Sequence, residues 1–200
     1  MDHSQRAHPP PNPEPTLFEQ PWPEGELRFF QLGFVVPDLL RAATDWSHVH
    51  GVGPFHVLPP VRTACTYRGT DSEIDMQIAV AQTGPVQIEL LHQRDDEPSI
   101  YRDLFAAHEG GFHQLCTVTF DYDAKRAHYE GLGYELVCEI VAGGQRVAHY
   151  DTVEHFGFFT EVVEHTDEFL AQVTGIARTC ATWDGSDPVR IVTRGGYRTP

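Results

Sequence analysis

The sequence of 200 residues lacks any apolar run long enough to cross a membrane, since a spanning helix needs about 20 consecutive apolar residues. It also lacks the apolar core of a secretory signal, because its N-terminus is polar and rich in proline. We therefore expect a soluble, cytoplasmic protein without a membrane partner.

Positive charge is scarce. The chain has 14 basic residues against 29 acidic ones, which gives a formal net charge of −15. Such a field repels a phosphate backbone and an anionic lipid surface, so nucleic acid and membrane are excluded as expected partners. The acidic surplus does not identify a substrate, because solubility alone would account for it.

Cysteine is also sparse, and no C-x-x-C pair occurs. In a cytosolic chain, wide spacing favours free buried thiols over disulfides or zinc ligands. No G-x-S-x-G elbow, H-E-x-x-H motif, P-loop or G-x-G-x-x-G motif stands in the context that its chemistry requires. The four thiols are Cys65, Cys116, Cys138 and Cys180.

The composition divides the chain into an arm, one folded domain and a tail. Residues 1–24 are rich in proline and polar groups, and we expect a flexible arm whose Phe18 and Trp22 contact the domain. The folded domain is expected over residues 25–183. The tail, residues 184–200, is expected to form loops.

The two halves of the domain predict the same order of elements. LRFFQLGFVV (27–36) alternates as a strand does, and Asp38 is expected to cap a helix that ends at Gly51. FHQLCTVTF (112–120) starts the second half as another strand, followed by a helix over 121–133. Further strands are predicted at 55–58, 65–68, 74–81, 86–91, 134–140, 146–152 and 158–163, and a last helix at about 166–183.

The two halves also resemble each other residue by residue. FFQLGFV (29–35) aligns without a gap on FHQLCTV (112–118), and the same offset places Asp38 on Asp121 before each helix. At the far ends, IELL (88–91) parallels TEVV (160–163), so that Glu89 corresponds to Glu161. The repeated order of elements favours a duplication over chance similarity.

Four segments resemble the signature regions of the glyoxalase-like, or vicinal oxygen chelate, superfamily, in the order found in that family. They are QLGFVVPDLLRA, GPVQIELLHQRDDEPSI, GGFHQLCTVTFDYDA and RVAHYDTVEHFGFFTEVVE, and they span about residues 29–164. The likeness is strongest to methylmalonyl-CoA epimerase-like and glyoxalase-4-type members. It implies an α+β fold of two βαβββ modules, at about 27–93 and 110–164, whose sheets form a cup around an internal cavity. Dimerisation is common in the family, so the resemblance also implies a homodimer.

The resemblance further implies a metal site inside the cup, built from the first and last strand of each module. Matching motif to motif gives Gln31, Glu89, Gln114 and Glu161. The two glutamines depart from the family pattern, which usually has histidine at both positions. His113 adjoins Gln114, but strand alternation turns it to the opposite face unless a β-bulge shifts the register.

This departure changes the expected chemistry. Two carboxylates and two amide oxygens suit Mg²⁺, Mn²⁺, Co²⁺ or another hard cation better than Zn²⁺. Without a metal, two neighbouring carboxyls cannot both ionise cheaply, and one becomes a proton-transfer group. Both alternatives stay open, and in both Glu89 and Glu161 are the predicted catalytic residues.

Simpler explanations exist for each of these side chains. Glu89 shares its strand face with Gln87 and Leu91, so that face could be solvated. Glu161, between Phe159 and Val163, is expected to be more enclosed. Most of the twelve histidines form no constellation, and none is predicted to be catalytic; the best of them is His149, within the strand RVAHYDT.

Two functions follow from the resemblance. The first is an isomerase, epimerase or lyase that moves a proton next to a carbonyl in a small organic acid, thioester or hydrophobic metabolite, with or without a divalent metal. The second is a metal-free protein that binds and sequesters a small molecule. Both imply a small-molecule ligand, and metal content together with turnover separates them.

Overall fold

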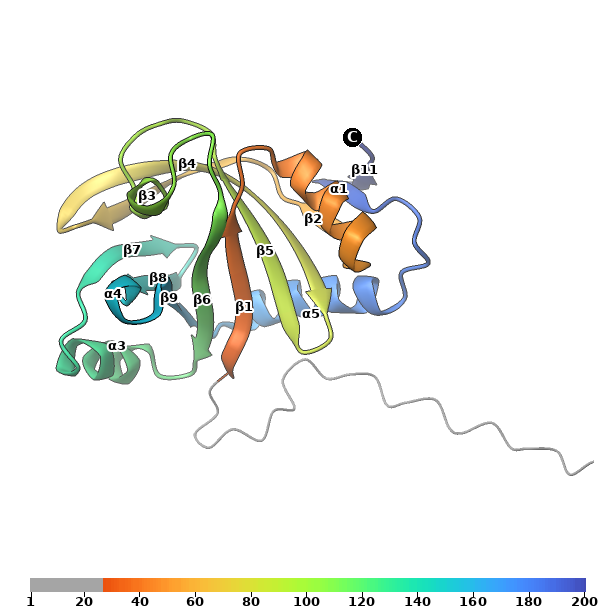
Figure 1. Ribbon diagram of the computed structural model, residues 1–200. Helices are drawn as coiled ribbons and strands as arrows, with labels where there is room; N and C mark the ends of the chain where they lie inside the picture. Colours follow the sequence, from red (N-terminus) through yellow and green to blue (C-terminus); the bar gives the residue numbers. More distant parts are fainter. Residues whose placement is uncertain (1–26) are drawn as a thin grey trace, which may run out of the picture.

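The computed structural model describes residues 27–200 of the chain (Figure 1). The predicted arm, with Phe18 and Trp22, lies outside these residues. The first module contains β1 (Leu27–Val35), α1 (Leu39–His50), β2 (Phe55–Val57), β3 (Val61–Tyr67), β4 (Thr70–Thr83) and β5 (Val86–Gln93). A linker with α2 (Ile100–Leu104) leads to the second module, β6 (Gly111–Thr119), α3 (Tyr122–Gly131), β7 (Leu136–Ala142), β8 (Gln145–Tyr150), α4 (Val153–Phe156) and β9 (Phe159–Glu164). The chain ends with α5 (Asp167–Ala181), β10 (Val189–Thr193) and β11 (Gly196–Arg198).

The predicted α+β fold of two similar modules is confirmed, and each helix begins where its sequence predicts. The Asp38 side chain accepts a hydrogen bond from the backbone N–H of Arg41, and that of Asp121 accepts one from Ala124. Each therefore caps one of the free N–H groups at a helix start. Gly51 ends α1 with φ of 64°, a left-handed conformation that suits glycine.

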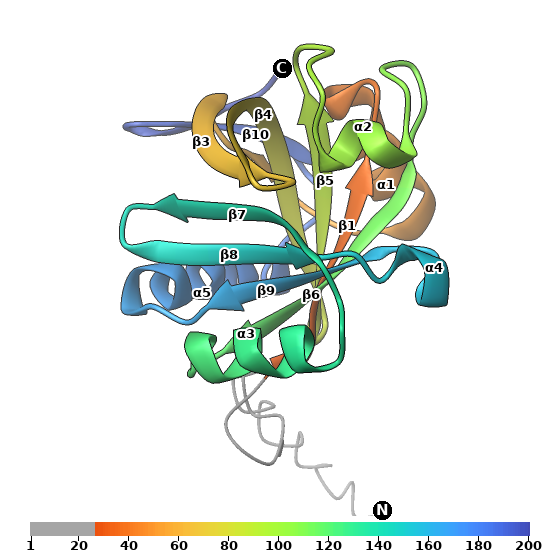
Figure 2. The ribbon, with the colours of Figure 1, turned by 90° about the vertical axis from the view of Figure 1, so that its left-hand side faces the viewer.

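The two modules close into a ring of eight strands, which is the form that the predicted cup takes. Strands β1 and β6 pair antiparallel and join the modules on one side. On the other side β3 pairs with β7, so the ring runs β1-β5-β4-β3-β7-β8-β9-β6 and returns to β1 (Figure 2). Periodicity within each strand predicts a curved sheet, but the pairing of β3 with β7 joins residues about 70 apart in the sequence and is set by the tertiary structure.

Apolar side chains fill both ends of this ring and cover its outside. Helix α1 packs on the outer face of β4 and β5, and α3 on the outer face of β8 and β9. Inside the ring, one apolar layer includes Val35, Leu91, Tyr101 and Phe159, and α5 contributes Val173 to the layer at the opposite end. The middle of the ring lies between these two layers.

The sequence alone indicated a loop for the C-terminal tail, but the structure shows two strands there. It contains β10, which pairs parallel with β2, and β11, which pairs antiparallel with β10. Val189 is buried against the α1 side of the sheet. The strand is short, so it depends on the open edge that β2 offers.

Among residues 27–200, no helix combines the length and the apolar character needed to cross a bilayer.

Candidate active site

Polar and thiol side chains form a belt on the inside of the ring, between its two apolar layers. The register places them side by side on successive strands: Gln31 stands opposite Gln87 and Cys116, Cys116 opposite Glu161, and Glu161 opposite His149. All of them are buried. This inner polar belt comprises Gln31, Gln87, Glu89, Gln114, Cys116, His149 and Glu161.

Three of the four side chains predicted for the site meet in this belt. Nε2 of Gln114 lies 3.0 Å from Oε2 of Glu161 and 3.3 Å from Oε2 of Glu89, and donates to both. The strand register brings Glu89 and Gln114 together, because Gly33 of β1 stands opposite Glu89 of β5 on one side and Gln114 of β6 on the other. Gly33 has no side chain, and the Gln114 side chain lies directly over it.

The fourth predicted residue, Gln31, points into the same belt but has a different partner. Its Nε2 donates to Oε1 of Gln87 at 2.8 Å. The face that Glu89 shares with Gln87 is therefore buried, not solvated. Sequence periodicity placed Gln87 on the right face, but it could not show that a neighbouring strand covers it.

Burial controls the charge of the two glutamates. Removal from water raises the pKa of Glu161 to about 7, although hydrogen bonds from Cys116 and Gln114 oppose the shift. Burial also raises the pKa of Glu89 well above its usual value, and the nearby Glu161 charge raises it further. In the absence of a metal, the pair therefore holds at least one proton near neutral pH.

Strand alternation predicts that His113 lies on the face opposite Gln114. The structure differs, and His113 lies on the same inner face. Gly33 pairs with Gln114 while the next residue of β1, Phe34, pairs with Phe112, so His113 is an extra residue in β6. This β-bulge turns its ring to the inside, where Nδ1 lies 2.8 Å from Oε1 of Gln114. A bulge depends on the partner strand, so the sequence of β6 could not reveal it.

Two further belt residues have polar atoms without a partner. His149 is 1% exposed, and its ring nitrogens lack a well-formed hydrogen bond, although Nε2 lies 3.5 Å from Oε1 of Glu161 and the backbone of Cys138 interacts weakly with the ring. Burial and the nearby His113 lower the pKa of His149 to about 3, so its ring is neutral. Nε2 of Gln87 is likewise buried without an acceptor. Unpartnered buried polar groups are costly, which makes both side chains candidates for contact with a ligand.

The Gln114 amide decides whether these side chains suit a divalent metal. A hard cation needs oxygen ligands, but the group found between the two carboxyls is an amide NH₂. Within residues 27–200, no three His, Cys, Asp or Glu side chains gather as a metal-binding group. In this orientation the amide offers a cation no ligand, whereas a half turn would place its oxygen between the carboxyls, and Glu89, Glu161 and that oxygen would then be the ligands. The four-ligand site stays a prediction from sequence.

Comparison with known proteins identifies the family of the chain. A profile of the Glyoxalase/Bleomycin resistance protein/Dioxygenase superfamily matches residues 30–150, more than half of the chain. The chain belongs to this superfamily. The match includes Gln31, Glu89 and Gln114, and it confirms the resemblance seen in the sequence.

Several solved structures of low sequence identity share the fold. One is a variant of Streptomyces coelicolor methylmalonyl-CoA epimerase in complex with 2-nitronate-propionyl-CoA, with a TM-score of 0.53 and 19% identity over 70% of this chain and 96% of that chain. Methylmalonyl-CoA epimerase from Mycobacterium tuberculosis matches with a TM-score of 0.50 and 18% identity over 72% and 91% of the two chains. A hypothetical protein from Bacillus halodurans matches with 0.51 and 16% over 70% and 94%. No protein of curated function matches the chain.

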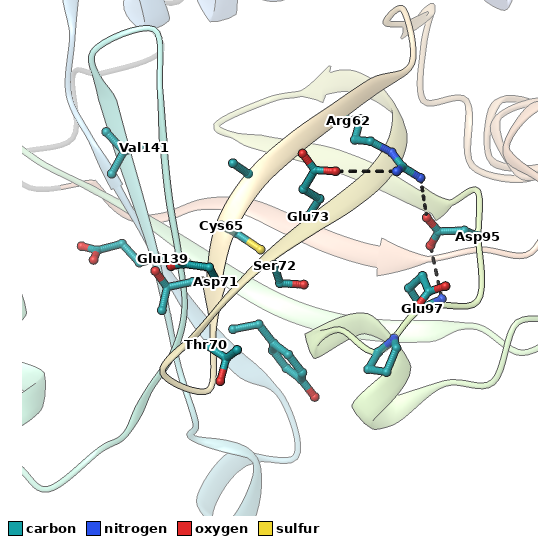
Figure 3. A pocket seen from close by; sticks show the side chains of 14 residues that line it. Arg62, Cys65, Thr70, Asp71, Ser72, Glu73, Asp95, Glu97, Glu139 and Val141 are labelled. Carbon is teal, nitrogen blue, oxygen red and sulfur yellow. Dashed lines mark hydrogen bonds and ion pairs between the residues drawn. The ribbon is translucent and has the colours of Figure 1, made fainter.

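A groove of about 880 Å³ lies where β3 meets β7, with residues of β3, β4 and β7 in its lining (Figure 3). Cys65 from β3 and Glu139 from β7 line it, and Arg62 bridges Glu73 and Asp95 along its rim. Three residue pairs join β3 to β7, fewer than at any other junction of the ring. Glu89 and Glu161 are each only 7% exposed, so a ligand needs an opening in the wall of this superfamily domain.

Gly33→Ala is expected to break the contact among the three central side chains. A Cβ at this position would lie 2.5 Å from Cγ of Gln114, so Gln114 must move away from both glutamates. We expect a loss of about 1–3 kcal/mol in the free energy of unfolding, measured by urea denaturation. Gly175→Ala in α5 is the control, because nothing lies within 4 Å of its added Cβ. Equal stability of Gly33→Ala and the wild type would contradict the packing described.

Proposed function

We propose that the protein is an enzyme that moves a proton to and from the carbon next to a carbonyl, as an isomerase or epimerase does. The observation that supports this most strongly is the pair Glu89 and Glu161, held on one side chain, Gln114, in a dry interior. Two carboxyls in such a place are driven to different protonation states. One can accept a proton while the other supplies one.

The two glutamates are suited to different roles. The pKa of Glu161, raised to about 7 by burial, makes this carboxyl a base that is half ionised near neutral pH. Burial and the Glu161 charge keep the pKa of Glu89 well above its usual value, so Glu89 stays protonated and serves as the acid. In the proposed reaction, Glu161 takes the proton from carbon, and Glu89 returns one.

The belt also offers hydrogen-bond donors for the oxygen that becomes negative. When the proton leaves, charge develops on the carbonyl oxygen of the substrate, and donors aimed at it lower the barrier. The unpartnered Nε2 of Gln87 is such a donor, and the neutral ring of His149 provides another through whichever nitrogen is protonated. We propose that both side chains contact the substrate oxygen.

The substrate class is proposed from the relatives. Two solved relatives of the same fold are methylmalonyl-CoA epimerases, one in complex with a CoA ester analogue. A 2-substituted acyl thioester, or a small organic acid, has the acidic C–H and the carbonyl that the belt could serve. Such a substrate would enter where β3 meets β7, beside the groove in Figure 3.

Deuterium exchange tests the proposed function without a coupled assay. The protein, purified without a tag, is incubated in D₂O with methylmalonyl-CoA, propionyl-CoA and 2-substituted organic acids, and the mass of each recovered compound is measured. We expect incorporation of one deuterium next to the carbonyl of at least one compound, and its loss in Glu161→Ala. Metal analysis of the same sample tests the predicted cation site.

A binder of the same fold is the alternative, and the closed ring favours it, because both glutamates are shielded from solvent. Tight binding of an apolar dye or of a CoA ester, with no deuterium exchange in any compound, would contradict the proposed enzyme and support a sequestering protein.

A further inference from the structure

A second groove, of about 480 Å³, lies on the outside of the second module, beside the place where β1 begins. Its lining includes residues of β1, β6, β9, α3 and α4. Leu115 and Thr117 of β6 line it, and they alternate with Gln114 and Cys116, which point into the ring. The groove is therefore separate from the inner polar belt. Five of its ten lining residues are aromatic, and we call it the aromatic groove: Phe29, Tyr129, Tyr134, Phe156 and Phe158.

An irregularity at the start of β1 turns Phe29 toward this groove. Leu27 pairs with Val118 and Gln31 pairs with Cys116, so β1 has two residues more than β6 in this interval. Strict alternation would place Phe29 on the inner face with Gln31. The extra residues instead allow Phe30 to be buried in the apolar layer of the ring while Phe29 lines the aromatic groove. The chain thus enters the fold at the edge of the groove.

The aromatic groove exposes more apolar surface than isolated side chains do. Phe29, Leu132 and Phe156 are 52%, 60% and 59% exposed. Phe156 stacks on Phe158, with 5.9 Å between the ring centroids. Exposed apolar side chains gathered in one hollow are typical of a surface that binds another apolar group.

The N-terminal arm has the composition that an aromatic groove binds. Seven of the 15 prolines of the chain lie within residues 1–26, and Trp22 stands between Pro21 and Pro23. Proline-rich segments bind in grooves lined by aromatic side chains, because the fixed φ of proline leaves little conformational entropy to lose. The sequence predicts that Phe18 and Trp22 contact the domain, and the aromatic groove is a surface suited to them.

The covalent connection to β1 favours the arm over a separate molecule. Trp22 precedes Leu27 by five residues, which cover at most about 17 Å when extended. Three neighbouring strands span about 10 Å, so Trp22 can reach across the floor that β1, β6 and β9 form. A short tether also gives the arm an effective concentration in the millimolar range, so that even weak contacts keep it bound.

Charge favours the same occupant. Lys125 lines the aromatic groove, with Nζ 5.9 Å from the centroid of the Tyr129 ring, and it is the only lysine of the chain. In the arm, Glu19 and Glu24 stand on either side of Trp22. A second copy would bring another formal charge of −15 to this face and be repelled, whereas the arm brings carboxylates to a single ammonium group.

We propose that segment 17–24 of the arm binds in the aromatic groove of its own chain, with Trp22 as the apolar anchor and Glu19 or Glu24 paired with Lys125. The bound segment covers Phe29 and Phe156 and fixes the first residues of β1, the strand that carries Gln31. The interaction lies outside the ring and does not rest on the proposed function.

The single lysine allows a direct test on the unaltered full-length protein. A carbodiimide joins the Lys125 amine to a nearby carboxyl as an amide, and peptide mass mapping identifies that carboxyl. We expect Glu19 or Glu24 of the same chain. Lys125 joined only to carboxyls within residues 27–200 would overturn the proposal. A mixture of unlabelled and ¹⁵N-labelled protein identifies the partner chain, and links of mixed isotope composition would assign the groove to a second copy instead.

Proteolysis measures how firmly the segment is held. Cleavage after Phe18 by dilute chymotrypsin requires the segment to leave the groove, so its rate follows the unbound population. We expect Phe156→Ser to raise this rate about fivefold or more. Phe120→Ser is the matched control, because Phe120 is 57% exposed but lies outside the aromatic groove. Equal cleavage rates in the wild type and both variants would contradict the proposal.

Discussion

Glu161→Gln is expected to abolish deuterium exchange and, at the same time, to stabilise the protein at alkaline pH. The amide of glutamine cannot accept a proton from carbon, but its oxygen can accept the hydrogen bond from Nε2 of Gln114 as the carbonyl oxygen of a protonated carboxyl does. The variant therefore resembles the protonated state of the site. It should fold normally while losing its base.

The stability gain follows from the sign of the pKa shift. The pKa of Glu161 in the folded protein, about 7, lies above its ordinary value of 4.5. The folded state thus keeps a proton that the unfolded chain has released, so this group favours folding at low pH, and that contribution disappears as the pH rises through 7. A difference of this size corresponds to about 3 kcal/mol.

The measurement compares unfolding of the two proteins across this range. We expect Glu161→Gln to gain about 3 kcal/mol relative to the wild type between about pH 5 and about pH 9. Glu164→Gln is the control on the same strand, because Arg146 lowers the pKa of Glu164 and its carboxylate is the stable form. That variant should lose stability without losing exchange activity. A stability difference for Glu161→Gln that does not change with pH would show that Glu161 is ionised throughout.

A disulfide across the junction of β3 and β7 is expected to stop turnover reversibly. Thr66 and Glu139 stand directly opposite each other in this short pairing, on the outer face. In Thr66→Cys/Glu139→Cys, oxidation would lock the ring closed over Glu89 and Glu161. If ligands enter here, exchange should fall by more than about tenfold on oxidation and recover on reduction.

The reduced double variant is its own reference, because Glu139 also accepts hydrogen bonds from Tyr122 and Arg126 that cysteine cannot replace. Glu139→Cys alone, treated with the same oxidant, controls for reaction at the native thiols. Full activity of the oxidised double variant would place the entrance elsewhere, for example at the end of the ring covered by α2.

The local pattern of apolar and polar residues in the sequence predicts most of the strands and helices of the fold. Alternation along β1, β5, β6 and β9 correctly predicted strands, and Asp38 and Asp121 cap their helices as the repeat indicated. The same alternation sends Glu89, Gln114 and Glu161 into one interior, since side chains of a strand alternate strictly between two faces. These features depend on residues near each other in the sequence.

The tertiary structure decided what depends on distant strands. The bulge that turns His113 inward forms only against β1, and the closing pair β3 and β7 joins the two modules. The strand character of the tail requires the edge of β2, and the neutrality of His149 requires the walls around it. Periodicity gives the face on which a side chain lies, but the partner strand sets its register and its burial. Register decides which side chains of the inner polar belt contact one another, and burial decides how strongly the pKa of each is shifted.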